Sequence, residues 1–150
     1  MLVEKIFDEI IYPELKEFIE NIENYHAKVT KVYPQDSKVF PIIPIRLLPI
    51  TNKYNNLNYG EETYSFGIEI DVFSTDQIIE ETKVSKKTIC DELTRIIVEY
   101  IKEFYHFTVK VTHDAPNVDS SVHRNIIKLT GVLDTKYGEN NLVIYPRLYR

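Results

Sequence analysis

The chain has 150 residues, a length that fits one domain able to bury most of its unfolded surface without disulfides or metal ions. Hydrophobic residues make up 43% and charged residues 27%, which excludes a disordered or fibrous class. The net charge of −5 offers no general attraction to nucleic acid or anionic lipid, because phosphate binding depends on clustered Lys and Arg. We therefore expect a single globular domain over residues 1–150.

The sequence contains one cysteine, Cys90, so an internal disulfide and a cysteine-based zinc cluster are excluded. Its place in a helical apolar pattern predicts a small buried side chain. Residues 1–18 alternate charged with apolar residues, and no run of eighteen apolar residues occurs. We expect neither a signal peptide nor a membrane span, and a protein that stays in the cytoplasm where it is made.

The first predicted element is an amphipathic helix over residues 2–22. Its apolar residues recur at steps of four, four, three and four, which is the spacing of one helix face. Pro13 lies inside this pattern and cannot donate a backbone hydrogen bond, so we expect a kink or a restart near Tyr12. The apolar positions are Phe7, Ile11, Leu15, Phe18 and Ile22.

The next segments predict strands and a loop. Residues 28–33 and 39–48 are rich in Val, Ile and Leu but interrupted by prolines, which favours edge-like or bulged strands. Residues 51–62 hold four asparagines, a glycine and almost no aliphatic side chains. We expect them to form a long exposed hairpin loop.

Residues 64–72 give the clearest strand pattern. Apolar residues alternate strictly with Ser65, Gly67, Glu69 and Asp71, so one face is expected in the core and the other in water. Apolar residues then recur at helical spacing over residues 84–104, with Ser85 or Thr82 able to cap the start. This second helix should cover the sheet.

The last third predicts more strands. Residues 107–111 alternate, residues 114–121 supply turn residues, and a long strand follows with Ile127, Leu129 and Leu133 on one face. Residues 138–141 turn the chain into a final strand. Strands cluster on either side of the second helix, so we predict an α+β fold with a mainly antiparallel sheet and two principal helices packed on one face.

Sequence signals for catalysis are weak. The histidines His26, His106, His113 and His123 lack the close spacing that metal ligation on one element needs. No nucleophile elbow, phosphate loop or dinucleotide-binding motif occurs, and four glycines make a phosphate cradle hard to build. We therefore predict no enzyme activity, no metal and no cofactor.

The sharpest enzymatic hypothesis rests on Glu69 and Asp71. Two carboxylates two residues apart on one strand share a face and could hold Mg²⁺ for phosphodiester hydrolysis. This segment resembles part of a restriction-endonuclease-like core. That family places a lysine where Asp71 stands, and we find no aspartate on a preceding strand. The alternative, which we favour, is the solvated face of a half-buried strand.

Five segments, in this order and spacing, resemble the tail terminator and tail-completion proteins of bacteriophages. They are the amphipathic opening helix, VYP with the proline-interrupted strands after it, YSFGIEIDVFSTD, TICDELTRIIVEYI, and NVDSSVHRNIIKLTGVLD closing on VIYPR. Together they span nearly the whole chain. Each motif alone is weak, and the order of all five carries the resemblance.

The resemblance implies an α+β virion protein without catalytic residues. It closes into a ring, typically a hexamer, on the last ring of tail-tube protein, where it ends tube growth and joins the tail to the neck. Its partners are copies of itself, the tube protein, a neck or head-completion protein and, in a contractile tail, the sheath protein. DNA passes through without specific binding, and no membrane is involved. The protein is made in the host bacterial cytoplasm and resides in the virion tail.

The family has no catalytic residues to carry over, so we predict interface regions. The loop over residues 51–62 should dock on the tube or line the channel. The C-terminal arm over residues 145–150 should pack on a neighbouring subunit, because its aromatic and arginine content is typical of interface anchors. The residues concerned are Tyr54, Asn55, Asn56, Asn58, Tyr59, Glu69, Asp71, Arg147, Tyr149 and Arg150.

Three alternatives remain open. Another neck component, such as a tail-to-head joining or head-closure protein, shares the fold and differs in what it touches, and a contractile-tail bacteriocin could use the same part. From a different class, the alternative is the metal-dependent nuclease that uses Glu69 and Asp71.

Overall fold

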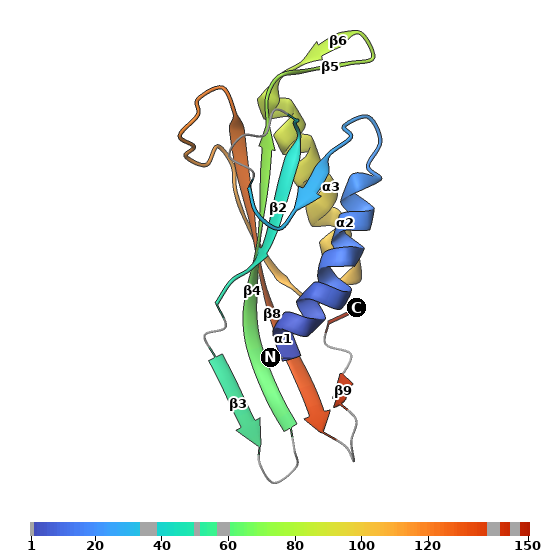
Figure 1. Cartoon of the computed structure of the whole chain (residues 1–150), viewed down its shortest axis with the longest axis vertical. Helices are drawn as coiled ribbons and strands as arrows, with labels where there is room; N and C mark the ends of the chain where they lie inside the picture. The colour runs from blue at the N-terminus through green and yellow to red at the C-terminus, as the bar shows by residue number, and fades with distance from the viewer. Residues whose placement is uncertain (1, 34–38, 50–51, 57–60, 138–141, 145–147) are drawn as a thin grey trace.

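The structure is a computed structural model that describes residues 2–33, 39–49, 52–56, 61–137, 142–144 and 148–150. At residues 2, 52–56, 61–64, 133–137 and 142–144 it describes the backbone alone. Helices form one layer and a long twisted sheet forms the other (Figure 1). None of the helices in the described part combines the length and the apolarity needed to cross a membrane.

The restart predicted near Tyr12 is present as a change of helix type, in a helix that continues through Pro13. It runs as α1 (Leu2–Ile6), a π-helical turn η1 (Phe7–Ile11) and α2 (Tyr12–Glu20). The Tyr12 N–H donates to the Phe7 carbonyl, and Pro13 sits in the first turn of α2, where its missing donor costs little. The wider turn thus accommodates the proline without ending the helix. The helix buries Val3, Ile6, Phe7, Ile11, Leu15 and Ile19, whereas Phe18 and Ile22 are partly buried.

The described strands form a seven-stranded sheet and a separate two-stranded hairpin. The sheet order is β1-β2-β4-β8-β7, with β3 paired to the start of β4 and β9 to the end of β8. In Figure 1, β3, the start of β4, the end of β8 and β9 extend past the N-terminal end of α1, away from the helices. The bounds are β1 Lys28–Thr30, β2 Ile42–Leu47, β3 Asn52–Asn56, β4 Glu61–Ser74, β5 Gln77–Ile79, β6 Thr82–Val84, β7 Thr108–Thr112, β8 His123–Tyr137 and β9 Leu142–Ile144.

The predicted fold class is confirmed. All pairs in the described sheet are antiparallel except β1 with β2, which is parallel. The N-terminal helix and α3 (Lys86–Phe104) lie on the same face of the sheet, as Figure 1 shows. Phe18 of α2 stacks on Tyr100 of α3 with ring centroids 3.8 Å apart, so the two helices also contact each other.

The prediction of edge-like or bulged strands is confirmed for β1, which lies at the edge of the sheet, but an edge position is wrong for β2, which pairs on both sides. β1 lies on one side and β4 on the other, although the ladder to β4 skips Ile43 and Pro44. A proline inside a paired strand is tolerated where no ladder bond requires its N–H. Ile42, Ile43 and Ile45 are fully buried, and this burial holds β2 inside the sheet.

The expected loop over residues 51–62 is partly a strand. Residues 52–56 form β3, which pairs with Glu61–Ser65 of β4. The predicted hairpin is therefore confirmed, but its two arms are strands that pair with each other instead of an irregular loop. Asn58 and Tyr59 lie outside the described residues.

Helix α3 begins as predicted. The Ser85 side chain accepts a hydrogen bond from the Thr88 N–H and satisfies one of the unpaired donors of the first turn. Cys90 is buried, as predicted. Its thiol donates weakly to the carbonyls of Val72 and His123, and burial raises its pKa to about 12. It is therefore not a nucleophile at neutral pH.

The hairpin of β5 and β6 was not predicted. Its turn residues, Glu80 and Glu81, both have positive φ, at 50° and 67°. Such a turn normally uses Asn and Gly, so its usual sequence signal is missing here. The hairpin carries the exposed Ile78 at the end of the molecule opposite to β3 and β9 (Figure 1).

Candidate interaction surface

The sheet face opposite the helices carries a row of charged residues. Pairing places Arg46 of β2 beside Glu69 of β4, Glu69 beside Lys128 of β8, and Lys128 beside Lys110 of β7. Directly paired residues share a face, so this row crosses four strands. Asp71 lies two residues after Glu69 on β4, and Arg124 lies four residues before Lys128 on β8. Because residues at even spacing on a strand point to the same face, both belong to this face. We call these six residues the charged row.

Glu69 does not stand in water as the alternation predicted. Its side chain is buried, with 5% of the residue exposed, and it accepts hydrogen bonds from Nη2 and Nε of Arg46 at 2.8 and 3.2 Å. The arginine is 60% exposed, so the pair itself contributes at most about 1 kcal/mol. Removing Arg46 would cost more, because the carboxylate would stay buried without its partner.

Asp71 is half-buried and, like Glu69, pairs with an arginine. Its Oδ2 accepts from Nη2 of Arg124 at 3.0 Å, and Arg124 further donates to the Pro116 carbonyl and covers the ring of Phe73. Burial, followed by the charge of Glu69, raises the pKa of Asp71 to about 6, although Arg124 opposes that rise. Among the described atoms, Oδ1 of Asp71 and Nε of Arg124 are buried without a hydrogen-bond partner.

These arginines bear on the nuclease hypothesis. Each carboxylate of the Glu69 and Asp71 pair already faces a guanidinium, which competes with a divalent ion for the carboxylate oxygens. Within the part of the chain that the structure describes, no group of three or more His, Cys, Asp or Glu residues is placed to hold a metal ion. The hypothesis stays a prediction that this geometry disfavours.

The two lysines of the charged row differ from the arginines. Lys110 and Lys128 are exposed and directly opposite each other, and neither side chain makes a hydrogen bond or ion pair within the described residues. Like charges placed opposite each other on neighbouring strands destabilise a sheet. This part of the surface therefore has a local excess of positive charge.

A groove of about 350 Å³ lies beside the row on the same face. Its floor is formed where Gly67 of β4 pairs with Thr130 of β8, because glycine contributes no side chain. The Leu48 side chain and Pro49 line one wall, and Ser65 and Phe66 complete the lining. The groove is open and partly apolar, which suits a protein side chain better than a small charged substrate.

The interface residues expected in β3 lie in the projecting part of the sheet. Tyr54, Asn55 and Asn56 pair with Thr63, Glu62 and Glu61 of β4. This portion of the sheet lies beyond the helices in Figure 1, as a surface for docking requires.

The C-terminal residues pack on their own chain. Tyr149 donates to Oε1 of Glu14 at 2.6 Å, and Arg150 donates to the Tyr105 carbonyl at 2.9 Å. Tyr105 donates to the other oxygen of Glu14, so this carboxylate joins α2 to the end of α3 and to the chain terminus. These contacts lie within one chain, and the packing of Tyr149 and Arg150 on a neighbour stays a prediction. Arg147 lies outside the described residues.

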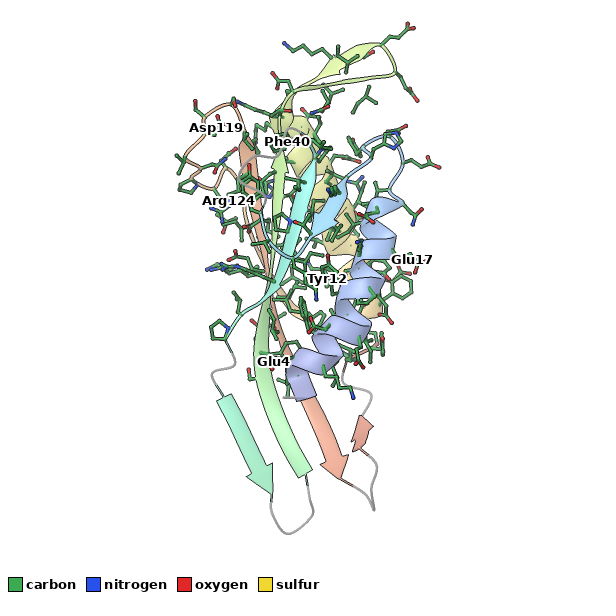
Figure 2. All side chains as sticks on the ribbon, in the orientation of Figure 1. Glu4, Tyr12, Glu17, Phe40, Asp119 and Arg124 are labelled. Atoms are coloured by element: carbon green, nitrogen blue, oxygen red, sulfur yellow. The ribbon has the colours of Figure 1, made fainter. Side chains whose placement is uncertain are left out.

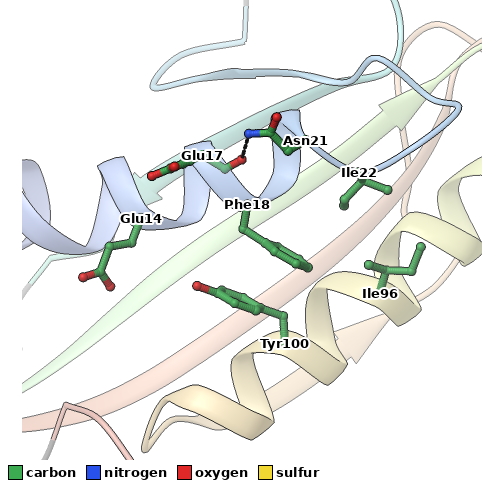
Figure 3. A pocket seen from close by; sticks show the side chains of 7 residues that line it. All are labelled: Glu14, Glu17, Phe18, Asn21, Ile22, Ile96 and Tyr100. Atoms are coloured by element: carbon green, nitrogen blue, oxygen red, sulfur yellow. Dashed lines mark hydrogen bonds between the residues drawn. The ribbon is translucent and has the colours of Figure 1, made fainter.

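A second groove lies on the helical side (Figure 3). It measures about 680 Å³ and lies between α2 and α3, where Phe18 and Tyr100 stack. Glu14 and Glu17 line it on α2, and Ile96 lines it on α3. This groove is acidic at its edge, in contrast to the lysines of the charged row.

A buried polar network was missed by the sequence analysis. Asn125 is fully buried, donates to Asp91 and Thr94, and accepts from the Asp114 N–H and from Nε2 of His123. His113 also contacts Asp91. Although burial opposes the change, hydrogen bonds from Asn125, Lys87 and His113 lower the pKa of Asp91 to about 2. Asn125 lies on the same face of β8 as Ile127 and Leu129. A polar residue at such a core-facing position could have indicated the network from the sequence. The network ties β8 and the loop before it to α3.

No protein-family model matches the chain, and no curated protein matches it in sequence.

Proposed function

We propose that this chain is a structural subunit of a phage-type tail, one that forms a ring at the head-proximal end of the tail tube. The five-segment resemblance motivates the proposal. The α+β architecture agrees with the fold class that the resemblance implies. The ring ends tube polymerisation and joins the tail to the neck, with copies of the chain, the tube protein and a neck protein as partners.

The observation that carries the proposal is the projecting sheet. β4 and β8 pair over fourteen residue positions, from Glu61 with Lys136 to Ser74 with His123. Their ends, together with β3 and β9, reach beyond the helices (Figure 1). A free-standing monomer gains little from strands that extend past its core, whereas a subunit that adds its strands to a tube surface uses them as contacts.

Negative-stain imaging of the purified protein with its tube protein tests the proposal. We expect rings at one end of each tube and shorter tubes as the ratio of this protein to tube protein rises. Tube protein alone is the control and should grow without a defined length. Tubes that grow equally long and uncapped in the presence of this protein would refute the assignment. Rings that attach instead to a purified neck component would identify another neck protein.

A further inference from the structure

The molecule presents two unlike faces, one helical and one formed by the open sheet. In Figure 2, Glu17 of α2 and Arg124 of β8 lie on opposite sides of the molecule. A contact between unlike faces is heterologous and repeats from copy to copy, and it closes into a ring when the rotation allows. The charges on the two faces decide whether such a contact is favourable.

The helical face is acidic because of the N-terminal helix and the turn that follows it. Residues 2–24 contain seven acidic residues and two lysines, a net charge of −5 that equals the net charge of the whole chain. Six of these acids are exposed, among them Glu9, Glu17 and Glu23. The acidic residues are Glu4, Asp8, Glu9, Glu14, Glu17, Glu20 and Glu23.

The sheet face has the opposite character. The charged row holds four basic and two acidic residues, a net charge of +2. Both acids are paired with arginines of the same face, so the excess charge resides on Lys110 and Lys128. A carboxylate supplied from outside would relieve the repulsion between these two lysines.

We propose that the open sheet face of one copy, at Lys110, Lys128 and the groove beside Gly67, receives the acidic N-terminal helix of a second copy. The lysines pair with exposed carboxylates of that helix, and the groove lies at the edge of the contact. Repetition of this contact builds the ring, so the inference rests on the proposed function and names the surfaces that the ring uses.

Duplex DNA is the other anionic occupant to consider. Its phosphates would meet Glu69 and Asp71 within the same row as the lysines, and the chain as a whole repels DNA through its net charge. The acidic helix, in contrast, belongs to the same chain as the lysines, so each copy supplies one acidic surface for each pair of lysines. The charge distribution therefore favours a second copy.

Cross-linking tests the contact directly. A zero-length carbodiimide reagent joins lysines to carboxylates that touch, and mixing ¹⁴N- with ¹⁵N-labelled protein identifies links between copies by mass spectrometry. We expect links from Lys110 or Lys128 to carboxylates of residues 2–24 of another copy, both in low-salt solution and on tube ends. Links between copies that avoid these lysines would overturn the inference, and so would the absence of any link between copies.

Charge reversal supplies the matched variants. Lys110→Glu with Lys128→Glu, or Glu9→Lys with Glu17→Lys, should each weaken self-association at least about tenfold in sedimentation at about 20 mM salt, because attraction becomes repulsion. The four changes combined in one chain should restore association. Lys83→Glu with Lys102→Glu changes the net charge equally at exposed positions elsewhere and should leave association intact. Failure of the combined variant to recover would overturn the inference.

The outcomes separate the inference from the proposed function. Rings on tube ends with cross-links elsewhere would keep the function and reject these surfaces. Lysine-to-helix links in copies that never cap a tube would keep the surfaces and reject the function. Duplex DNA binding that is lost in Lys110→Glu with Lys128→Glu, measured by fluorescence polarisation, would assign the lysines to nucleic acid and overturn the inference.

Discussion

A single buried side chain, Asn125, holds three parts of the fold together. It makes hydrogen bonds to Asp91, Thr94, Asp114 and His123, which belong to α3, the loop after β7 and the start of β8. Its loss would leave buried donors and acceptors without partners, and each such group costs about 1–3 kcal/mol. The network is therefore a main determinant of stability at this end of the molecule.

We expect Asn125→Ala to lower the free energy of unfolding by about 2–4 kcal/mol, for the unsatisfied groups and the space left behind. Urea denaturation measures this change. Asn117→Ala is the control, because the Asn117 amide makes contacts of 3.4 and 3.5 Å near the surface, and it should cost less than about 1 kcal/mol. Equal effects of the two substitutions would contradict the role assigned to Asn125.

Asp71 predicts a dependence of stability on pH. Its folded pKa of about 6 lies above the ordinary value of about 4, so the folded state binds a proton more tightly than the unfolded state does. The free energy of unfolding should therefore fall as the pH rises from about 4 to about 6. Glu69→Gln removes a neighbouring negative charge, so it should lower the pKa of Asp71 and flatten this dependence. Carbon-13 NMR of the side-chain carboxyl measures the titration, with Glu23→Gln as the distant control.

At the scale of the element, two glycines of the central strand pair have different structural roles. A Cβ on Gly131 of β8 would lie 2.6 Å from the ring of Phe107 and 3.0 Å from that of Phe66, which meet edge to face. A Cβ on Gly67 of β4 would meet the flexible end of Leu48 at 3.0 Å. Gly131 thus makes room for an aromatic pair in the core, whereas Gly67 shapes the groove on the open face.

We predict that Gly131→Ala lowers the free energy of unfolding by about 1–3 kcal/mol, because two rings must move in a packed core. Gly67→Ala should cost less than about 1 kcal/mol, because the Leu48 side chain can turn away. Thermal unfolding followed by circular dichroism compares the two variants. Similar midpoints for both would show that Phe107 repacks freely and that the glycine is not required.

At the scale of the whole molecule, the core and the projecting sheet are separate regions. Among the side chains that the structure describes, the buried apolar ones lie in residues 3–129 and at Leu148, whereas β3 and the start of β4 lie beyond the helices. Changes in the projecting hairpin should therefore affect assembly more than folding.

Deleting residues 55–59 tests this separation. We expect the free energy of unfolding to change by less than about 1 kcal/mol, because none of the identified core residues is removed, and docking on tube ends to be lost. Glu80→Asn with Glu81→Gly alters the turn at the opposite end and should leave docking unchanged. Normal docking of the deletion variant in negative-stain images would exclude the hairpin from the tube contact.

Much of the fold follows from local pattern. The alternation at Phe66, Ile68, Ile70 and Val72 predicted the buried face of β4, and the Ser85 cap and the helical spacing after it predicted α3. The π-helical turn before Pro13 did not follow, because a proline inside a helical pattern is compatible with a break, a kink or a wider turn. The hairpin at Glu80 and Glu81 did not follow either, because its turn lacks the residues that usually signal it.

By itself, the sequence determined the α+β class, the places of the helices and the main strands, and the acidic character of the N-terminal helix. All of these depend on residues close together in the chain. Only the tertiary structure decided which charges meet. Glu69 pairs with Arg46 from 23 residues away, and Asp71 with Arg124 from 53 residues away. Sheet register brings such distant residues together, and since it depends on packing of the whole sheet, no local pattern specifies it.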